Sequence, residues 1–495
     1  MYRRLGCLAL ALAGCGGATG DTEATTGPGD GACDLAITPP AMTTARLQIG
    51  PDGALFDEHG RRVILRGINT GGRSKWAPFL PFPIDPEAGV DEVRAAADVF
   101  YGRLVDWGLD TVRMPLSWEA LEPTEGAYDG RYLDRYEAMV DAAWAHGLRV
   151  IVDFHQDVYA SPYCGDGFPL WTLEDPDPGP ARHDCPQWFL GYVNNTGVRA
   201  AFDHLWADDT GVQTQLFAMW AEVAGRLAEH PGVVGFELIN EPGWGTAADV
   251  GAWKRDVLAP FYAALAAELR ALAPDALILY DNPGIDALGV AAIEHARPQG
   301  EGFVYAPHLY DSGLINGLPW TGADPTPVLE DMVSFARGEG LPLLLGEFGV
   351  AQGAAGGEAW MTLIMAAIDA SGTSATLWEY SQNEEPWNAE DLSVVDASGE
   401  PRAGLDRYVR PWLRAVAGDD ASFAWDPALG RFEASWTAGD GVTEVVLPPR
   451  RFTGGLEALS VTGDGACHSL DLAAGRLWIR ASAGADVQLS FTAAP

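Results

Sequence analysis

Lysine is almost absent from this chain of 495 residues. Lys75 and Lys254 are the only two, and 69 acidic residues stand against 31 basic ones, which gives a net charge of −38. A nucleic-acid backbone is bound through cationic side chains that displace its counterions, so this charge excludes nucleic acid as a partner. Apolar residues make up 47% and charged residues 20% of the chain, as in globular proteins.

The chain also lacks an apolar run long enough to span a bilayer. The run Leu5–Ala13 follows two arginines and ends at Gly14-Cys15, which resembles the lipobox of bacterial lipoprotein signals. We expect residues 1–15 to be a signal peptide that ends at a lipidated Cys15, and residues 16–40 to be a flexible tether. The protein is then an exported lipoprotein of the bacterial cell envelope, held to the membrane only through Cys15. An ordinary signal peptide would make it a secreted protein.

Cysteines are few, and they lack the spacing of a metal site. No Cys-x-x-Cys or His-x-x-x-His pattern accompanies them, so we expect no metal. Without Cys7 and Cys15 four cysteines remain, and they allow three disulfide pairings. The natural local pair is Cys164–Cys185, which leaves Cys33–Cys467 to tie the end of the tether to the C-terminal region.

Eight short apolar runs alternate with stretches of helical pattern. They lie at 63–69, 111–116, 149–155, 233–240, 277–282, 303–310, 342–349 and 374–380. Near-continuous Val, Ile and Leu favour parallel strands buried on both faces. The first run lacks the G-x-G-x-x-G loop of an open nucleotide-binding sheet. The pattern predicts an α/β fold, a (β/α)₈ TIM barrel over 41–413, followed by a small antiparallel β-sandwich over 418–495.

Polar and aromatic residues stand where these runs end. In a (β/α)₈ barrel the carboxyl ends of the strands face the catalytic bowl. Because burying so many polar groups without purpose costs free energy, we interpret the set as a site. Its members are Asn69, Arg113, His155, Asn240, Glu241, His308, Tyr310, Glu347 and Trp378.

Two carboxylates in one bowl are what retaining glycoside hydrolysis requires. Glu241 ends the fourth run and Glu347 ends the seventh. One carboxyl protonates the leaving oxygen while the other attacks the anomeric carbon. Arg113 and Tyr310 are donors that would keep Glu347 ionised as the nucleophile, and Asn240 would hold a sugar hydroxyl. His155 and His308 would orient the carboxyls, and Trp378 offers an apolar face to a sugar ring.

Together these motifs resemble glycoside hydrolase family 5. They are NEP at 240–242, GEFG at 346–349, VRMPLSW at 112–118, His308-x-Tyr310 and the tryptophan of the eighth run. The resemblance covers about residues 60–412. It implies a retaining enzyme without metal or cofactor, in which Glu241 is the acid/base and Glu347 is the nucleophile.

A narrower resemblance concerns the stretch DFHQD at 153–157, which is similar to that of endoglycoceramidases. In those enzymes the last Asp binds a sugar hydroxyl and a Lys after the first strand contacts the sugar. The resemblance assigns these roles to Asp157 and Lys75. The loop around Lys75, NTGGRSKWAPF, departs from the loop expected of that group.

Apolar loops at 76–83, 167–171 and 313–320 are candidates for a lipid-binding platform, or for a lid packed on itself. We therefore expect a monomeric β-glycosidase that cleaves the bond between a glycan and a lipid. The alternatives are an endo-β-1,4-glucanase or mannanase that acts on soluble polysaccharide, and a non-catalytic carbohydrate-binding lipoprotein.

Overall fold

The computed structural model describes residues 31–33, 36–289 and 292–494. The predicted signal peptide, Cys15 and most of the predicted tether lie outside the described residues.

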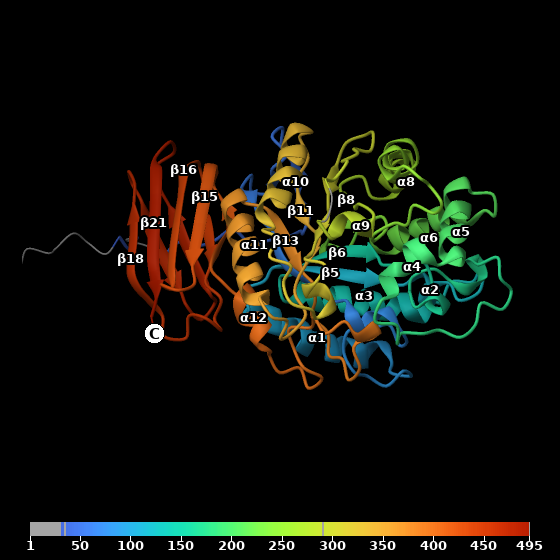
Figure 1. Cartoon of the computed structure of the whole chain (residues 1–495). Helices are drawn as coiled ribbons and strands as arrows, with labels where there is room; N and C mark the ends of the chain where they lie inside the picture. Colours follow the sequence, from blue (N-terminus) through green and yellow to red (C-terminus); the bar gives the residue numbers. More distant parts are fainter. Residues whose placement is uncertain (1–30, 34–35, 290–291, 495) are drawn as a thin grey trace, which may run out of the picture.

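Eight parallel strands form the barrel that the sequence predicts, one in each apolar run (Figure 1). Their order around the sheet is β11 (Leu344–Leu345), β13 (Ser374–Leu377), β4 (Arg66–Asn69), β5 (Thr111–Leu116), β6 (Arg149–Phe154), β7 (Val233–Glu237), β8 (Leu277–Tyr280) and β9 (Phe303–Tyr305). A parallel bridge between Tyr305 and Leu343 joins the two ends of the sheet. This confirms the predicted fold class.

The sixth and seventh runs each continue as a second short strand. These are β10 (His308–Leu309) and β12 (Glu347–Phe348), which pair in parallel with His308 opposite Glu347. Pro307 has no N–H for the sheet and interrupts the sixth run, and its carbonyl accepts the N–H of Gly346. The break thereby sets a histidine and a carboxylate side by side at the barrel mouth.

Helices surround the barrel and bury one apolar face each against it. Helix α3 is an example. The Asp129 side chain accepts hydrogen bonds from two N–H groups in the first turn of the helix, and Tyr136 and Met139 are buried. The α-helices are α1 (Val90–Asp106), α2 (Trp118–Leu121), α3 (Gly130–Ala145), α4 (Gly191–Asn194), α5 (Thr196–Ala207), α6 (Val212–Leu227), α7 (Val250–Trp253), α8 (Ala259–Leu272), α9 (Gly284–Ala287), α10 (Thr326–Gly338), α11 (Gly357–Ser371) and α12 (Ala403–Tyr408).

The C-terminal region is the predicted antiparallel β-sandwich, with Trp412, Phe432 and Trp436 in its core. One sheet holds β15 (Gly418–Asp426), β16 (Arg431–Ala438), β21 (Asp486–Ala493) and β18 (Leu456–Thr462). The other runs β1 (Gln48–Ile49), β2 (Leu55–Phe56), β3 (Arg62–Val63), β14 (Trp412–Val416), β17 (Thr443–Val446), β20 (Arg476–Arg480) and β19 (Cys467–Asp471). Residues 48–63, which the sequence analysis places with the barrel, thus extend a sheet of the sandwich.

The sandwich lies at the amino ends of the barrel strands. In Figure 1, β5 and β6 point away from it. Both favoured disulfides are formed, and Cys33–Cys467 fastens the start of the described chain to the sandwich. Within the described ranges no helix has the length and apolarity needed to cross a membrane.

Candidate active site

A cavity of about 280 Å³ opens at the carboxyl ends of the barrel strands. Seven of the ten residues predicted for the site line it: Lys75, His155, Asp157, Glu241, Tyr310, Glu347 and Trp378. Arg113, Asn240 and His308 lie behind them, buried and hydrogen-bonded to the others. Asn69, the one strand-end residue not assigned a role in the site, is buried, and its side-chain oxygen accepts a hydrogen bond from Arg113. The fold thus brings the whole predicted set to one place.

Glu347 begins β12, and each of its oxygens accepts a hydrogen bond. Arg113 donates to Oε1 at 2.7 Å and the Tyr310 hydroxyl donates to Oε2 at 2.8 Å. The two donors fix the orientation of the Glu347 carboxyl in the cavity, as a nucleophile requires.

Glu241 stands four residues past the end of β7, with a left-handed φ of 36°. Its own N–H donates to Asp281, and its Oε1 lies 2.8 Å from Nδ1 of His308. Burial, reinforced by the negative charge of Asp157, raises the pKa of Glu241 to about 8. Gly284 faces this carboxyl, and a Cβ there would lie 2.4 Å from Oε2. Glu241 is thus a protonated acid at neutral pH.

The two carboxyls are close together. Glu241, Glu347 and His308 each place one side-chain oxygen or nitrogen within 4.8 Å of those of the other two. Retaining glycosidases hold their carboxyls about 5–5.5 Å apart, whereas inverting enzymes leave about 6.5–9.5 Å for a water. Burial lowers the pKa of His308 to about 3, so this imidazole is neutral between the two acids.

Arg113 holds the floor of the site together. It donates twice to Glu237, at 2.7 and 2.8 Å, lies 3.0 Å from Asp153, and also donates to Asn240. Glu237 and Asp153 are absent from the sequence prediction. Each is a charged residue inside a mostly apolar strand run, as Arg113 is, and that pattern was the available signal.

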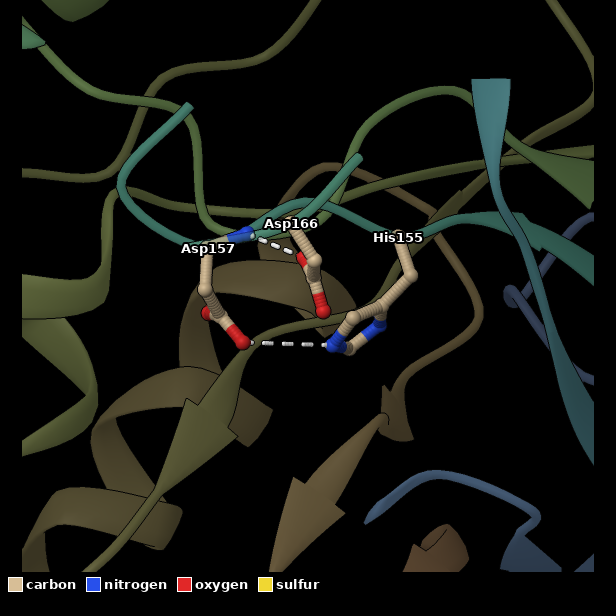
Figure 2. Close-up of side chains that lie close together, drawn as sticks. All are labelled: His155, Asp157 and Asp166. Carbon is tan, nitrogen blue, oxygen red and sulfur yellow. Dashed lines mark hydrogen bonds and ion pairs between the residues drawn. The ribbon is translucent and has the colours of Figure 1, made fainter. Parts of the chain in front are cut away.

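A second cluster contains His155, Asp157 and Asp166, which Figure 2 shows, and Lys75. The Lys75 ammonium donates to Asp157, whose N–H donates to Asp166 at 2.8 Å. His155 Nε2 lies 3.5 Å from Asp157, and its ring stacks on Trp378. Burial and the charge of Asp157 raise the pKa of Asp166 to about 8. His155, Asp157 and Asp166 have the spacing of a metal-ligand set, but Lys75 already supplies their cation.

The sequence analysis missed Glu390, which also lines the cavity. Its carboxylate lies 3.8 Å from the Lys75 ammonium and accepts a hydrogen bond from Trp188 at 2.9 Å. Burial raises the pKa of Glu390 to about 7. Trp387, Trp378 and Trp188 place their rings within 3.9, 4.5 and 5.6 Å of the ammonium. Lys75 is therefore a buried cation in a cage of aromatic rings and carboxylates.

The apolar wall of the cavity comes from segments other than those expected. Its members are Trp188, Phe189, Leu190, Val193, Trp244, Ile285, Leu288 and Ile315. Of the three predicted loops, 313–320 supplies Ile315. In the other two, Leu80, Phe82 and Phe168 are buried in the core, whereas Leu170 is exposed and does not line the cavity.

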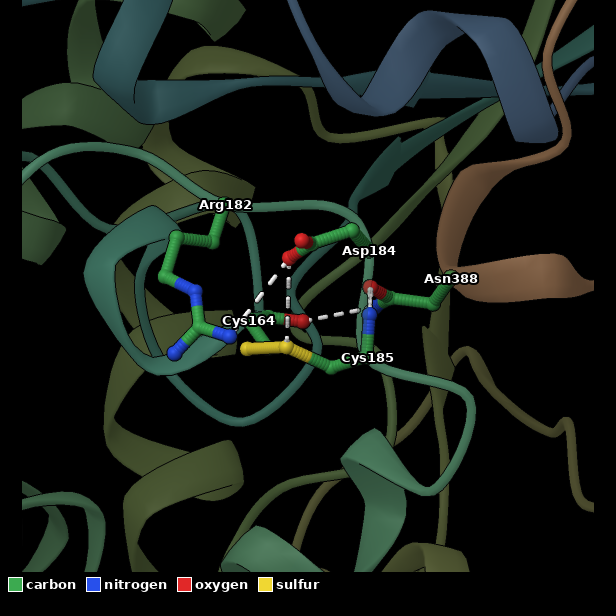
Figure 3. Close-up of a disulfide and its surroundings, with 5 residues drawn as sticks. All are labelled: Cys164, Arg182, Asp184, Cys185 and Asn388. Carbon is green, nitrogen blue, oxygen red and sulfur yellow. Dashed lines mark hydrogen bonds and ion pairs between the residues drawn. A yellow bond between two sulfur atoms is a disulfide. The ribbon is translucent and has the colours of Figure 1, made fainter.

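The Cys164–Cys185 disulfide lies just before the apolar wall in the chain (Figure 3). One side chain joins its two ends: Asn388 donates to the carbonyl of Cys164 at 2.7 Å and accepts from the N–H of Cys185 at 2.9 Å. Asn388 belongs to the short helix η7 (Trp387–Ala389), and Cys185 precedes η4 (Trp188–Leu190). The wall and the lysine cage are thus fastened to each other.

Curated relatives align with part of the chain. Endoglycoceramidase I of Rhodococcus hoagii is 35% identical over 210 residues, 41% of this chain and 38% of that protein. Endoglycoceramidase of Cyanea nozakii is 28% identical over 232 residues, 41% of this chain and 45% of that protein. The chain therefore spans about two fifths of the length of the curated relatives it matches.

A solved structure of endo-glycoceramidase II from Rhodococcus sp., in complex with a five-membered iminocyclitol, superposes with a TM-score of 0.71 at 27% identity. The superposition covers 90% of this chain and 100% of the chain of that structure. The sequence pattern of the cellulase family, glycosyl hydrolase family 5, matches residues 57–384. That range includes every strand of the barrel as well as Glu241 and Glu347, and the chain belongs to glycosyl hydrolase family 5.

Proposed function

We propose that this protein is a retaining β-glycosidase that hydrolyses the bond between a glycan and a lipid. The observation that carries the proposal is one cavity with two kinds of lining. Two carboxyls, each with one oxygen within 4.8 Å of an oxygen of the other, lie in it together with a charged cluster around Lys75 and an apolar wall that includes Phe189 and Ile285. Similarity to endoglycoceramidases supports the same substrate class.

The environments of the two carboxyls assign their roles. Glu347, whose two oxygens accept hydrogen bonds from Arg113 and Tyr310, attacks the anomeric carbon. Glu241, protonated at neutral pH, gives its proton to the departing lipid oxygen, and a covalent glycosyl-enzyme forms. Glu241 is then the base that takes a proton from water as the water attacks the same carbon. Two inversions give net retention.

The other polar residues bind and orient the sugar. Lys75, Asp157 and Glu390 reach the cavity with one cation and two carboxylates, which suit the hydroxyls of a glycan. Trp378 presents an indole to the cavity, and His155 stacked on it is kept charged by Asp153, which outweighs burial and raises the pKa of His155 to about 10. Asn240 is fixed by Arg113 and by the carbonyl of Gln156.

The test compares lactosylceramide with a soluble aryl lactoside, carboxymethylcellulose and mannan. We expect release of intact lactose and ceramide, with β-lactose as the first product seen by NMR. Rapid depolymerisation of either polysaccharide with no turnover of glycolipid would favour the glucanase or mannanase alternative. No turnover of any substrate would favour the non-catalytic one.

We also propose that the protein is exported and carries a lipid at Cys15. The basis is the lipobox-like end of the apolar run at 5–13, together with two disulfides, which persist in oxidising compartments. Metabolic labelling with a palmitate analogue tests this. Loss of label and of membrane attachment in Cys15→Ser is the expected result.

A further inference from the structure

The proposed reaction assigns no role to Asp281, a buried carboxyl that directly follows β8. Its Oδ2 accepts the N–H of Glu241 at 3.0 Å and lies 3.3 Å from Nε2 of His308. Its Oδ1 accepts the N–H of Asn282 at 2.6 Å. Asp281 therefore contacts the proton donor of the reaction directly, and it also lies behind the histidine that contacts the same donor.

The surroundings of His308 indicate which of its ring nitrogens carries the proton. The imidazole is neutral, so only one of the two does. Nδ1 lies 2.8 Å from Oε1 of Glu241 and 3.5 Å from Oε2 of Glu347. Glu347 acts as a carboxylate in the proposed reaction, and a carboxylate oxygen can only accept a hydrogen bond. A proton on Nδ1 serves both carboxyls, whereas a lone pair there would face a negative charge. The geometry favours the Nδ1–H tautomer, in which Nε2 is an acceptor.

A buried acceptor nitrogen needs a donor. Nε2 of His308 is buried, and in the described part of the chain no group forms a hydrogen bond with it at standard geometry. Asp281 is placed to supply one, because a carboxylic acid carries an O–H and its Oδ2 lies 3.3 Å away. A hydroxyl at Oδ2 still accepts the N–H of Glu241. Hydrogen bonds in sites without substrate are often long and shorten when substrate binds.

The charges around Asp281 favour its protonated form. Burial raises the pKa of Asp281 well above its ordinary value, and the charges of Glu241 and Glu237 add to this effect. The N–H of Glu241 and the charge of Arg113 oppose the rise without cancelling it. The remaining neighbour, His308, is neutral.

We propose that Asp281 is a positioning residue that, as a carboxylic acid, donates a hydrogen bond to Nε2 of His308 and thereby keeps the imidazole proton on Nδ1. Nδ1–H then donates to Oε1 of Glu241, so the acidic proton of Glu241 is held on Oε2. That oxygen lies beside Gly284 in the lining of the cavity, where its proton is available to the leaving oxygen. After Glu241 has given up this proton, the same Nδ1–H stabilises its carboxylate. This role rests on the proposed function, because it concerns the acid of that reaction.

The tautomer of His308 can be read without substrate. The unaltered full chain is labelled with ¹⁵N at its nine histidines, and the ring nitrogens are observed by NMR at neutral pH. His308→Gln serves only to assign the signals. We expect His308 to show a protonated Nδ1 and an unprotonated Nε2. A protonated Nε2, or a ring protonated at both nitrogens, would overturn the proposal.

The second experiment compares Asp281→Asn with Asp281→Leu. An asparagine whose amide N–H points at Nε2 of His308 loses the acceptor for the Glu241 N–H, as leucine does, but it keeps a donor to Nε2. We expect Asp281→Leu to lower kcat/KM for lactosylceramide roughly 10–100-fold, with the first step on a dinitrophenyl lactoside nearly unchanged. Asp281→Asn should keep the Nδ1–H tautomer and retain about tenfold more of the lactosylceramide turnover than Asp281→Leu does.

A purely structural role of Asp281 would lower the turnover of all lactosides alike, and the two variants would then lose equally. Either result would overturn the proposal, and denaturant titration checks that both variants are folded. If the unaltered protein hydrolysed no lactoside at all, the proposed function would be refuted. The NMR measurement would still decide whether Asp281 holds His308 in the Nδ1–H tautomer, so the two failures are distinguishable.

Discussion

The two ends of the barrel are both rich in buried charges, but the balance of the charges is opposite. At the amino end, four arginines meet three carboxylates beneath the sandwich. Arg414 donates to Asp110 and Glu444, Arg476 donates to Glu444, and Arg149 donates to Asp110. Arg61 pairs with Asp57. Every carboxylate named here is paired with an arginine. Burial alone would raise the pKa of Glu444, but the charges of Arg414, Arg476 and Arg61 outweigh burial and lower it.

At the carboxyl end, carboxyls outnumber the cations. Burial raises the pKa of Glu241 and of Asp166 to about 8, and that of Glu237 and of Glu390 to about 7. The same residue types thus give a structural joint at one end and a reactive site at the other. Perturbed carboxyls that open into a cavity mark function, whereas fully paired ones mark cohesion.

The largest expected effect is at the reactive end. Glu347→Ala should lower kcat roughly 10⁴-fold or more, because it removes the nucleophile. Azide should restore turnover of an activated aryl glycoside and give a product of inverted configuration, identified by NMR. Rescue without inversion would assign the nucleophile to another residue.

Glu241→Ala should separate substrates by leaving group. Turnover of glycolipids, whose alkoxide leaves poorly, should fall about 10²–10⁴-fold, whereas the first step on dinitrophenyl glycosides should hardly change. The measurement is kcat/KM across a series of aryl glycosides. Equal losses along the series would contradict the assignment of Glu241 as proton donor.

The same residue predicts a pH dependence. Because Glu241 has a pKa near 8 and acts as an acid, its protonated form is present below pH 8 and is lost above it. We expect kcat/KM for glycolipids to fall about tenfold per pH unit on the alkaline side. Dinitrophenyl glycosides, which need no proton, are the control and should lack this limb.

The joint at the amino end should respond in stability and not in catalysis. Glu444→Gln removes the carboxylate between Arg414 and Arg476, and we expect a loss of about 3–5 kcal/mol in the free energy of unfolding. The matched control is Glu433→Gln, which breaks an exposed pair with Arg431 and should cost about 0–1 kcal/mol. Denaturant titration measures both, and kcat of the folded enzyme should stay unchanged.

Acid should abolish the same contribution. Since the pKa of Glu444 is lowered below its ordinary 4.5, the stability it provides is present above pH 4.5 and is lost as the pH falls further. Glu444→Gln should therefore lose less stability than the unaltered protein on acidification. An identical acid response would show that Glu444 is not part of the joint.

The sequence sufficed for the barrel because each strand is an apolar run, and for Glu241 and Glu347 because short motifs mark the ends of two of those runs. It did not suffice for β1–β3. These strands are two residues long, which is too short to show a period, and they are fixed by pairing with β14, more than 340 residues away in the chain.

The apolar wall could not be predicted for a related reason. The loops at 76–83 and 167–171 and the segment 188–193 are equally apolar in composition. Tertiary packing buries Phe82 and Phe168 and exposes Leu190 and Val193. Glu390 was missed because no strand or motif precedes it, and its contact with Lys75 joins residues more than 300 positions apart.

The smallest expected effect concerns Asn388 at the carboxyl end of the barrel. Its neutral hydrogen bonds hold chain segments together there, as ion pairs do at the amino end. Asn388→Ala removes the bridge between Cys164 and Cys185 and leaves the buried carbonyl of Cys164 without its partner, at a cost of about 1–3 kcal/mol. Trp387 and Glu390 flank Asn388 and form part of the cage around Lys75, so the proposed sugar-binding lysine should become less well positioned. We expect a several-fold rise in KM for lactosides, with kcat nearly unchanged because Glu241 and Glu347 keep their own contacts. A purely structural role would lower stability alone and leave KM as it is. The control is Gln213→Ala, which removes a side-chain hydrogen bond to the carbonyl of Leu205 and does not line the cavity.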